Sequence, residues 1–243
     1  MLVAAWWGFV GGCALLVGGL LGSLLNTPRR FIGLVMAFGA GVLISALAFE
    51  LTREAYDQSG GGIVVIGLAA GALVFFAGDL IIDRRGGEHR KSSKGEVHDA
   101  GSSSAIVLGS LLDGVPESVA IGVSLLGGGS VGVAVVAAVF LSNIPESLSA
   151  SAGMRESGKS VRYILAVWTG VTAIATVSSL AGYALLDGVS ANVTAAIQAF
   201  AAGAILTMLS DTMVPEAVEH AGGVVGLATV AGFAAAFLLS MAG

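Results

Sequence analysis

Two short segments near the middle of the sequence carry carboxylates next to a proline. The first, DGVPES at 113–118, contains Asp113 and Glu117, and the second, SNIPES at 142–147, contains Glu146. Both segments lie inside long apolar runs. A charged side chain at the centre of a membrane helix costs about 2.5–3.5 kcal/mol even on the mildest insertion scale. Ionisable residues in such places mark ion or proton pathways by default.

The spacing of these residues suits the binding of a cation. Asp113 and Glu117 are four positions apart, so they share one helix face about 6 Å apart along the axis. Pro116 and Pro145 have no backbone N–H, so each is expected to kink its helix and to leave a carbonyl oxygen exposed one turn earlier. Oxygen-rich clusters of this kind suit divalent cations. The predicted ligands are Asp113, Glu117, Ser142, Asn143 and Glu146.

A purely structural interpretation of the two segments is weaker. One proline kink is usually only a kink, and one buried carboxylate is often a protonated hydrogen-bond donor between helices. Here two similar Pro-Glu elements occur with an additional aspartate, and three buried carboxylates repel one another unless protons or a cation neutralise them. Transport of protons or monovalent cations therefore stays open as an alternative to a divalent metal.

The rest of the sequence has the composition of a membrane protein. Of 243 residues, 56% are hydrophobic and 11% are charged, whereas an average soluble domain has about 25% charged residues. The apolar runs are long enough to cross a bilayer as helices, and the 37 glycines suit close helix packing in lipid. The sequence predicts an all-α polytopic membrane protein, a single domain over 1–243. Eight transmembrane helices are expected at 3–25, 32–51, 62–83, 104–126, 130–152, 161–186, 192–213 and 221–242.

The basic residues predict the orientation of these spans. With eight spans, all eleven Lys and Arg residues except Arg53 fall on one side of the membrane. Basic loops stay in the cytoplasm, so we expect the loop 84–103 there and both termini outside the cytoplasm, in a multi-pass protein of the cell (plasma) membrane. His89 and His98 in this loop suit weak metal capture, although a solvated linker is the simpler interpretation.

An internal similarity relates the second and seventh spans. MAFGAGVLISALAFELTREA (36–55) aligns without gaps with QAFAAGAILTMLSDTMVPEA (198–217). Spans five apart run in opposite directions, so the similarity predicts an inverted repeat of spans 1–3 and 6–8 around a central pair, spans 4 and 5. Glu50 and Asp211, near the ends of the repeated spans, are candidates for a secondary pathway. The aligned pairs include Phe38 with Phe200, Gly41 with Gly203 and Glu54 with Glu216.

With these features the sequence resembles the ZIP (Zrt/Irt-like) family of divalent-metal transporters. The resemblance covers the whole chain: eight spans, both termini outside, a long cytoplasmic loop after span 3, and a Pro-Glu element in spans 4 and 5. That family carries His-Asn-x-Pro-Glu-Gly in span 4 and a similar His-x-x-Pro-Glu-Gly in span 5. Pro116, Glu117, Pro145 and Glu146 match these motifs, and the resemblance implies that the two glutamates bind metal. It also implies uptake of zinc or a related ion into the cytoplasm.

The sequence departs from the family motifs in ways that affect the metal. Asp113 and Ser142 stand in place of the family's histidines, and Gly114 stands in place of an asparagine. A site made only of oxygen ligands favours harder ions such as Mn²⁺ and widens the expectation from Zn²⁺ toward Mn²⁺ and Fe²⁺. Thr176 replaces a span-6 glutamate that helps many members to hold a second metal, which favours one metal ion. The ion is expected as substrate, with no permanent cofactor.

Other functional classes fit the sequence less well. An enzyme is not expected, because no predicted span contains a histidine and FAGD (76–79) lacks the first glycine of the intramembrane aspartyl protease motif. A sensor or scaffold that kept the ZIP-like fold without transporting is a further alternative. The expected partners are the metal-ion substrate and the lipid bilayer, with no nucleic acid. A homodimer is left open by the sequence.

Overall fold

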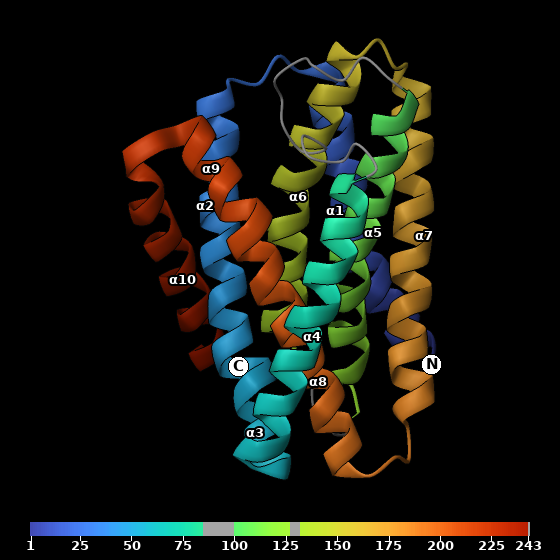
Figure 1. Ribbon diagram of the computed structural model, residues 1–243, viewed down its shortest axis with the longest axis vertical. Coiled ribbons are helices and arrows are strands. Elements are labelled where there is room, and N and C mark those ends of the chain that lie inside the picture. The colour runs from blue at the N-terminus through green and yellow to red at the C-terminus, as the bar shows by residue number, and fades with distance from the viewer. Residues whose placement is uncertain (85–99, 127–131, 243) are drawn as a thin grey trace.

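The structure is a computed structural model, and it describes residues 1–84, 100–126 and 132–242. These residues form a bundle of helices without a strand (Figure 1). The long helices are α1 (Leu2–Leu24), α2 (Arg29–Ala46), α4 (Gly61–Ile82), α5 (Ala100–Val123), α6 (Val133–Glu156), α7 (Val161–Leu186), α8 (Ala191–Met208) and α10 (Val225–Ala242). The short elements are α3 (Arg53–Ser59), α9 (Val214–Ala221), the π-helical turns η1 (Leu47–Thr52) and η3 (Leu209–Met213), and the 3-10 turn η4 (Gly222–Val224).

The helices have the length and composition of membrane spans. In the described part of the chain, seven helical stretches are long and apolar enough to cross a bilayer. The last, Ala191–Met241, has 51 residues, which as one straight helix would measure about 76 Å against a hydrocarbon core of about 30 Å. It is not straight: Gly222 has a φ of 67°, and α10 returns alongside α2 (Figure 1). The predicted polytopic all-α fold is confirmed, while the count of eight spans stays a prediction.

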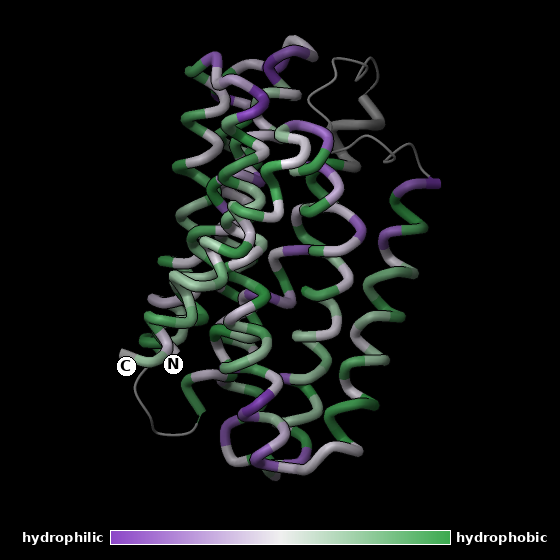
Figure 2. Tube along the Cα trace, turned by 90° about the vertical axis from the view of Figure 1, so that its left-hand side faces the viewer, coloured by the Kyte–Doolittle hydropathy of each residue, from purple (hydrophilic) through white to green (hydrophobic). Residues whose placement is uncertain are grey.

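Polar and apolar side chains are distributed as in a protein surrounded by lipid. Large apolar side chains such as Ile66, Leu185 and Leu227 are more than two-thirds exposed, whereas Asp113 and Glu117 are buried. Hydrophobic positions run along the length of the bundle, and hydrophilic stretches gather toward its two ends (Figure 2). This is the reverse of a soluble domain, in which exposed apolar surface is limited and charged residues lie outside.

The second and seventh predicted spans are longer than the sequence suggested. α2 continues through η1 and α3 to Ser59, beyond the predicted end at residue 51, and α8 continues through η3 and α9 to Ala221, beyond residue 213. Polar residues after each predicted end suggested a loop. Each helix in fact continues to a glycine with a positive φ, Gly60 at 76° and Gly222 at 67°. The helix ends there because a positive φ breaks the helical conformation, and only glycine adopts it without strain.

The irregular features recur at matching positions of the two halves. Gly60 and Gly222 are separated by the same number of residues as Phe38 and Phe200, and so are the first residues of η1 and η3. A π-helical turn is a rare feature. Its presence at the same aligned position in two antiparallel helices is what the predicted inverted repeat requires.

Glycines bring the repeated helices into close contact in the same reciprocal way. A Cβ atom at Gly71 of α4 would collide with the carbonyl oxygen of Phe200 on α8, and one at Gly232 of α10 would collide with that of Phe38 on α2. The reciprocal contacts are Gly203 with Leu68 and Gly41 with Thr229. The pairs α2–α10 and α4–α8 are therefore packed backbone against backbone, as small residues allow in membranes.

The helices fall into two groups by their contacts. The first group consists of α1, α5, α6 and α7: α1 packs against the other three, and α5 also packs against α7. The second group consists of α2, α4, α8, α9 and α10: α2 packs against α10 and α9, and α4 packs against α8. Within the first group, the hydroxyl groups of Thr172 and Ser179 on α7 donate to the carbonyls of Gly12 and Ala4 on α1, at 3.0 and 2.9 Å. The groups meet where α6 contacts α2 and α5 contacts α8.

One end of the bundle carries most of the described basic residues. Arg29 begins α2, and Arg155 lies in the last turn of α6. Lys159 lies between α6 and α7, and Arg162 lies in the first turn of α7. These helix ends lie together at the top of Figure 1, whereas Arg53 in α3 lies at the opposite end. The charge separation that was predicted from the sequence is present, and its direction relative to the cytoplasm stays a prediction.

Candidate metal-binding site

The five predicted ligands lie on two neighbouring helices of the first group. Asp113 and Glu117 are on α5, and Ser142, Asn143 and Glu146 are on α6. The two helices contact each other. All five side chains are buried: Glu117 has no exposed surface, Asp113 is 1% exposed and Glu146 is 7% exposed. These carboxylates are therefore enclosed by protein, which requires compensation of their charge.

Hydrogen bonds orient the polar side chains of α6. The Nδ2 atom of Asn143 donates to the carbonyl of Gly11 on α1 at 3.1 Å, so the amide oxygen is the end that can approach a cation. Ser142 donates to the carbonyl of Val139 at 3.0 Å, and Ser147 donates to the carbonyl of Asn143 at 2.7 Å. With their protons used in this way, hydroxyl oxygens keep lone pairs that can accept or coordinate.

The two prolines lie inside uninterrupted helices. Pro116 is within α5 and Pro145 is within α6, and neither can donate to the carbonyl four residues earlier. For Pro145 this carbonyl belongs to Leu141. It faces α2, since a Cβ atom at Gly39 would lie 3.5 Å from the Leu141 oxygen and 3.2 Å from the Cα atom of Ser142. A glycine thus lets α2 cover the backbone next to the predicted ligands.

Gly114 provides open space beside two of the carboxylates. It is buried, yet a Cβ atom placed on it would meet no other atom within 4 Å. The position lies directly after Asp113 and one helical turn from Glu117. The bundle therefore has room beside Asp113 and Glu117.

The carboxylates are not drawn together into a complete metal site. Across residues 1–84, 100–126 and 132–242, no group of three or more His, Cys, Asp or Glu side chains is arranged so that it could hold a metal ion. Asp113, Glu117 and Glu146 thus do not form such a group in this conformation. The ligand set stays a prediction. A bound ion would use fewer than three carboxylates together with neutral oxygens, or α5 and α6 would have to move closer to each other.

The residues predicted for a secondary pathway lie on the π-helical turns. Glu50 is in η1, is partly buried, and accepts a hydrogen bond from the hydroxyl of Ser240 on α10. Asp211 is in η3 and is exposed. Both are therefore on the second group of helices, apart from the elements that carry the predicted ligands. His89 and His98 lie outside the described residues.

Glu216 is a buried carboxylate in the segment between the predicted spans 192–213 and 221–242. It is only 7% exposed and accepts a hydrogen bond from the hydroxyl of Ser149 on α6. Ser142, Glu146 and Ser149 are spaced by four and three residues, so they share one face of α6. Glu216 on α9 therefore meets α6 about one turn beyond Glu146, toward the end of the bundle that carries Arg29, Arg155 and Arg162, which we call the arginine-rich end. Its alignment with Glu54 was the signal that could have marked it.

A comparison with known proteins identifies one similar transporter. An Arabidopsis thaliana protein named "Putative zinc transporter" is 28% identical to this chain over 196 residues, which are 79% of this chain and 31% of the relative. The chain thus spans about a third of the length of that protein. No protein-family model matches the chain. The similarity supports a relationship to zinc transporters and suggests metal-ion transport by a multi-pass membrane protein.

Proposed function

We propose that the chain is a ZIP-type carrier that moves a divalent metal cation into the cytoplasm. The observation that carries the proposal is the pair of Pro-Glu elements on adjacent helices, with Glu117 and Glu146 buried inside the bundle. The name of the similar plant protein supports transport rather than enzymatic activity. We place the protein in the cell membrane, with eight spans and with the arginine-rich end in the cytoplasm.

A cation would offset the cost of burying these side chains. Removing one partner of a buried charge pair is destabilising by about 3–5 kcal/mol, because an uncompensated charge remains in a medium of low dielectric constant. A divalent ion between α5 and α6 would neutralise two carboxylates at once. Asn143 and Ser142 supply neutral oxygens on the same helix as Glu146, in keeping with the oxygen coordination of hard cations.

Transport would require the two groups of helices to move relative to each other. The ion would be carried by the group of α1, α5, α6 and α7, and α2 and α8 would cover it. Glu117 has no exposed surface, so this conformation is closed at the site. Because Ser149 and Glu216 connect α6 to α9 across the groups, opening toward the arginine-rich end would break this contact and expose a carboxylate along the exit path.

The ligand types support one ion and a broad choice of metal. The hydroxyl of Thr176 donates to the carbonyl of Thr172 in its own helix at 2.8 Å, so it provides no charged group for a second ion. Oxygen ligands without imidazole bind Mn²⁺ and Fe²⁺ as well as Zn²⁺. We propose Zn²⁺ or a related ion such as Mn²⁺ or Fe²⁺ as the substrate.

Proton or monovalent-cation transport is the second candidate. It is favoured by one observation: the described residues contain no preformed group of three metal-ligating side chains. Carboxylates that exchange only protons need not converge on one point. In that case Glu117 and Glu146 would act separately, and no metal would compete with protons for them.

Uptake into liposomes distinguishes these candidates. The purified protein is reconstituted, and the entry of Zn²⁺ and Mn²⁺ and the internal pH are followed with dyes. We expect metal uptake that Glu117→Gln and Glu146→Gln each abolish, while Glu156→Gln, an exposed glutamate on α6, has no such effect. Proton movement that needs no metal would contradict the proposal and support the second candidate.

A further inference from the structure

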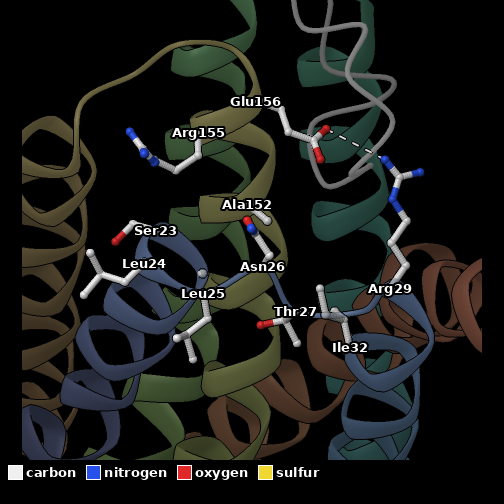
Figure 3. A pocket seen from close by; sticks show the side chains of 11 residues that line it. Ser23, Leu24, Leu25, Asn26, Thr27, Arg29, Ile32, Ala152, Arg155 and Glu156 are labelled. Atoms are coloured by element: carbon white, nitrogen blue, oxygen red, sulfur yellow. Dashed lines mark ion pairs between the residues drawn. The ribbon is translucent and has the colours of Figure 1, made fainter.

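A hollow of about 270 Å³ lies at the arginine-rich end of the bundle, away from the candidate metal ligands. It is formed by the last turn of α1, the connection to α2, and the last turn of α6 (Figure 3). Its volume is at the low end for a small-molecule site, so it suits a compact group. Its polar lining consists of Ser23, Asn26, Thr27, Arg29, Arg155 and Glu156.

Two arginines from different elements flank this hollow. Figure 3 shows Arg155 of α6 on one side and Arg29 of α2 on the other, with Asn26 and Thr27 between them. Arg29 forms an ion pair with Glu156 at 3.8 Å, with both side chains about half exposed. Arg155 donates a long hydrogen bond of 3.5 Å to the carbonyl of Lys159. Among the residues that line the hollow, two are arginines and one is a carboxylate.

The start of α2 adds to this positive charge. α2 begins directly after Pro28, and no side chain caps its first turn. The N-terminus of a helix carries a partial positive charge and backbone N–H groups that favour anions. Arginine presents a planar group of donors that matches the oxygens of a phosphate, often in a bidentate manner. The combination of cavity, arginines and helix start selects for an anion with several oxygens.

Exposed apolar side chains lie at the hollow as well. Leu24 and Leu25 line the same hollow and are 63% and 54% exposed, and Phe31 on the next turn is 55% exposed. A free anion gains nothing from these neighbours. A phospholipid does, since its phosphate can bind the arginines while its acyl chains lie against the leucines at the membrane boundary.

We propose that this hollow binds the phosphate group of an anionic phospholipid. The site is independent of the metal-transport proposal, because it shares no residue with the predicted ligands. Bound lipid would connect the end of α6, in the first group of helices, to the start of α2, in the second group. It would thereby stabilise the conformation in which these two ends lie together.

The test is thermal stability in detergent with added lipid. The purified full chain is heated with phosphatidylglycerol, with phosphatidylcholine or with inorganic phosphate, and the apparent affinity is taken from the shift of the melting temperature. We expect phosphatidylglycerol to stabilise the protein more than the other two. Arg155→Gln should weaken the apparent affinity by about tenfold. The matched control is Arg53→Gln, an exposed arginine at the opposite end whose side chain is 71% exposed, and it should bind like the wild type.

Each remaining outcome decides against the proposal. Equal stabilisation by inorganic phosphate would make the ligand a free anion, and equal loss in Arg53→Gln would mean a general effect of charge. No stabilisation by phosphatidylglycerol would remove the site. If Arg155→Gln is poorly folded, Asn26→Ala replaces it in the test, because it changes no charge and lies in the exposed connection between α1 and α2. This variant must then show the same loss of apparent affinity for phosphatidylglycerol.

Discussion

Asp113 is the residue at which this chain departs most clearly from the ZIP motif that its sequence resembles. It is 1% exposed, and Gly114 next to it leaves open space inside the bundle. An aspartate offers hard oxygen ligands, whereas the imidazole in the related motif favours Zn²⁺. On our account, the choice of metal depends on this position, because Glu117 and Glu146 are common to both kinds of site.

Asp113→His should shift the metal preference toward zinc. The space beside Gly114 can take up part of the larger ring, and imidazole binds Zn²⁺ better than Mn²⁺. We expect the ratio of the apparent Zn²⁺ affinity to the Mn²⁺ affinity to rise on the order of tenfold, measured by competition in a thermal-shift titration. The conservative control is Asp113→Asn. An unchanged ratio in Asp113→His would show that this side chain does not face the ion.

The buried carboxylates could be predicted from the sequence, but their arrangement could not. Asp113, Glu117 and Glu146 stand out because a carboxylate within an apolar run is costly. Their convergence on one point depends on the rotation of α5 against α6, which no local pattern encodes, and the described side chains do not form such a group. Glu216 was misplaced for a similar reason. It lies outside the predicted apolar runs, between residues 213 and 221, and its burial depends on packing against α6.

At the scale of the helices, glycines determine how closely the repeated elements pack. Gly71→Ala should destabilise the protein by about 1–3 kcal/mol, since the methyl group would collide with the Phe200 carbonyl and the backbones of α4 and α8 would separate. Gly170→Ala is the matched control: it is also within a helix, α7, but a Cβ atom there meets open space. Melting temperatures in detergent should fall for the first variant and stay level or rise for the second.

The contact between α6 and α9 yields a second prediction at this scale. Ser149→Ala removes a hydroxyl that donates to the buried carboxylate of Glu216, so it should lower stability by about 1–3 kcal/mol. Ser124→Ala removes a hydroxyl that, directly after α5, donates to the nearby carbonyl of Ile121 at 2.8 Å, and it should change stability much less. Equal melting temperatures of the two variants would show that the Ser149–Glu216 contact contributes no stability.

The helix boundaries show what hydropathy can and cannot predict. The apolar runs located the long helices, because the length of a membrane-spanning helix is set by the bilayer. The continuation of α2 to Ser59 and of α8 to Ala221 was missed, because polar residues end each apolar run while the helix goes on through a π-helical turn. Gly60 and Gly222 were the available signals for the true ends.

For the whole molecule, the distribution of charge predicts how the bundle is oriented in the membrane. Cysteine replaces Ser92 in one variant and Ser190 in another, after the native Cys13 has been changed to serine. In intact cells, an impermeant thiol reagent should label Ser190→Cys, at the exposed connection between α7 and α8, and should not label Ser92→Cys. Labelling of Ser92→Cys from outside would contradict the eight-span orientation.

The inverted repeat also belongs to this scale, and it could be recognised from sequence because it left identical residues at aligned positions. Phe38 with Phe200 and Gly41 with Gly203 are such pairs, and their contacts on α10 and α4 are reciprocal in space. The division into two packed groups of helices was not visible in the sequence. It follows from which glycine faces which backbone, a property of the assembled bundle.

The most direct test of the account is metal binding by the variant that carries both Glu117→Gln and Glu146→Gln. Glutamine keeps the shape of the side chain and removes its charge, so the metal-free protein should fold and be at least as stable as the wild type. In detergent, Zn²⁺ or Mn²⁺ should raise the melting temperature of the wild type and leave that of the double variant unchanged. Equal stabilisation of both proteins at the same metal concentration would contradict the proposed site between α5 and α6.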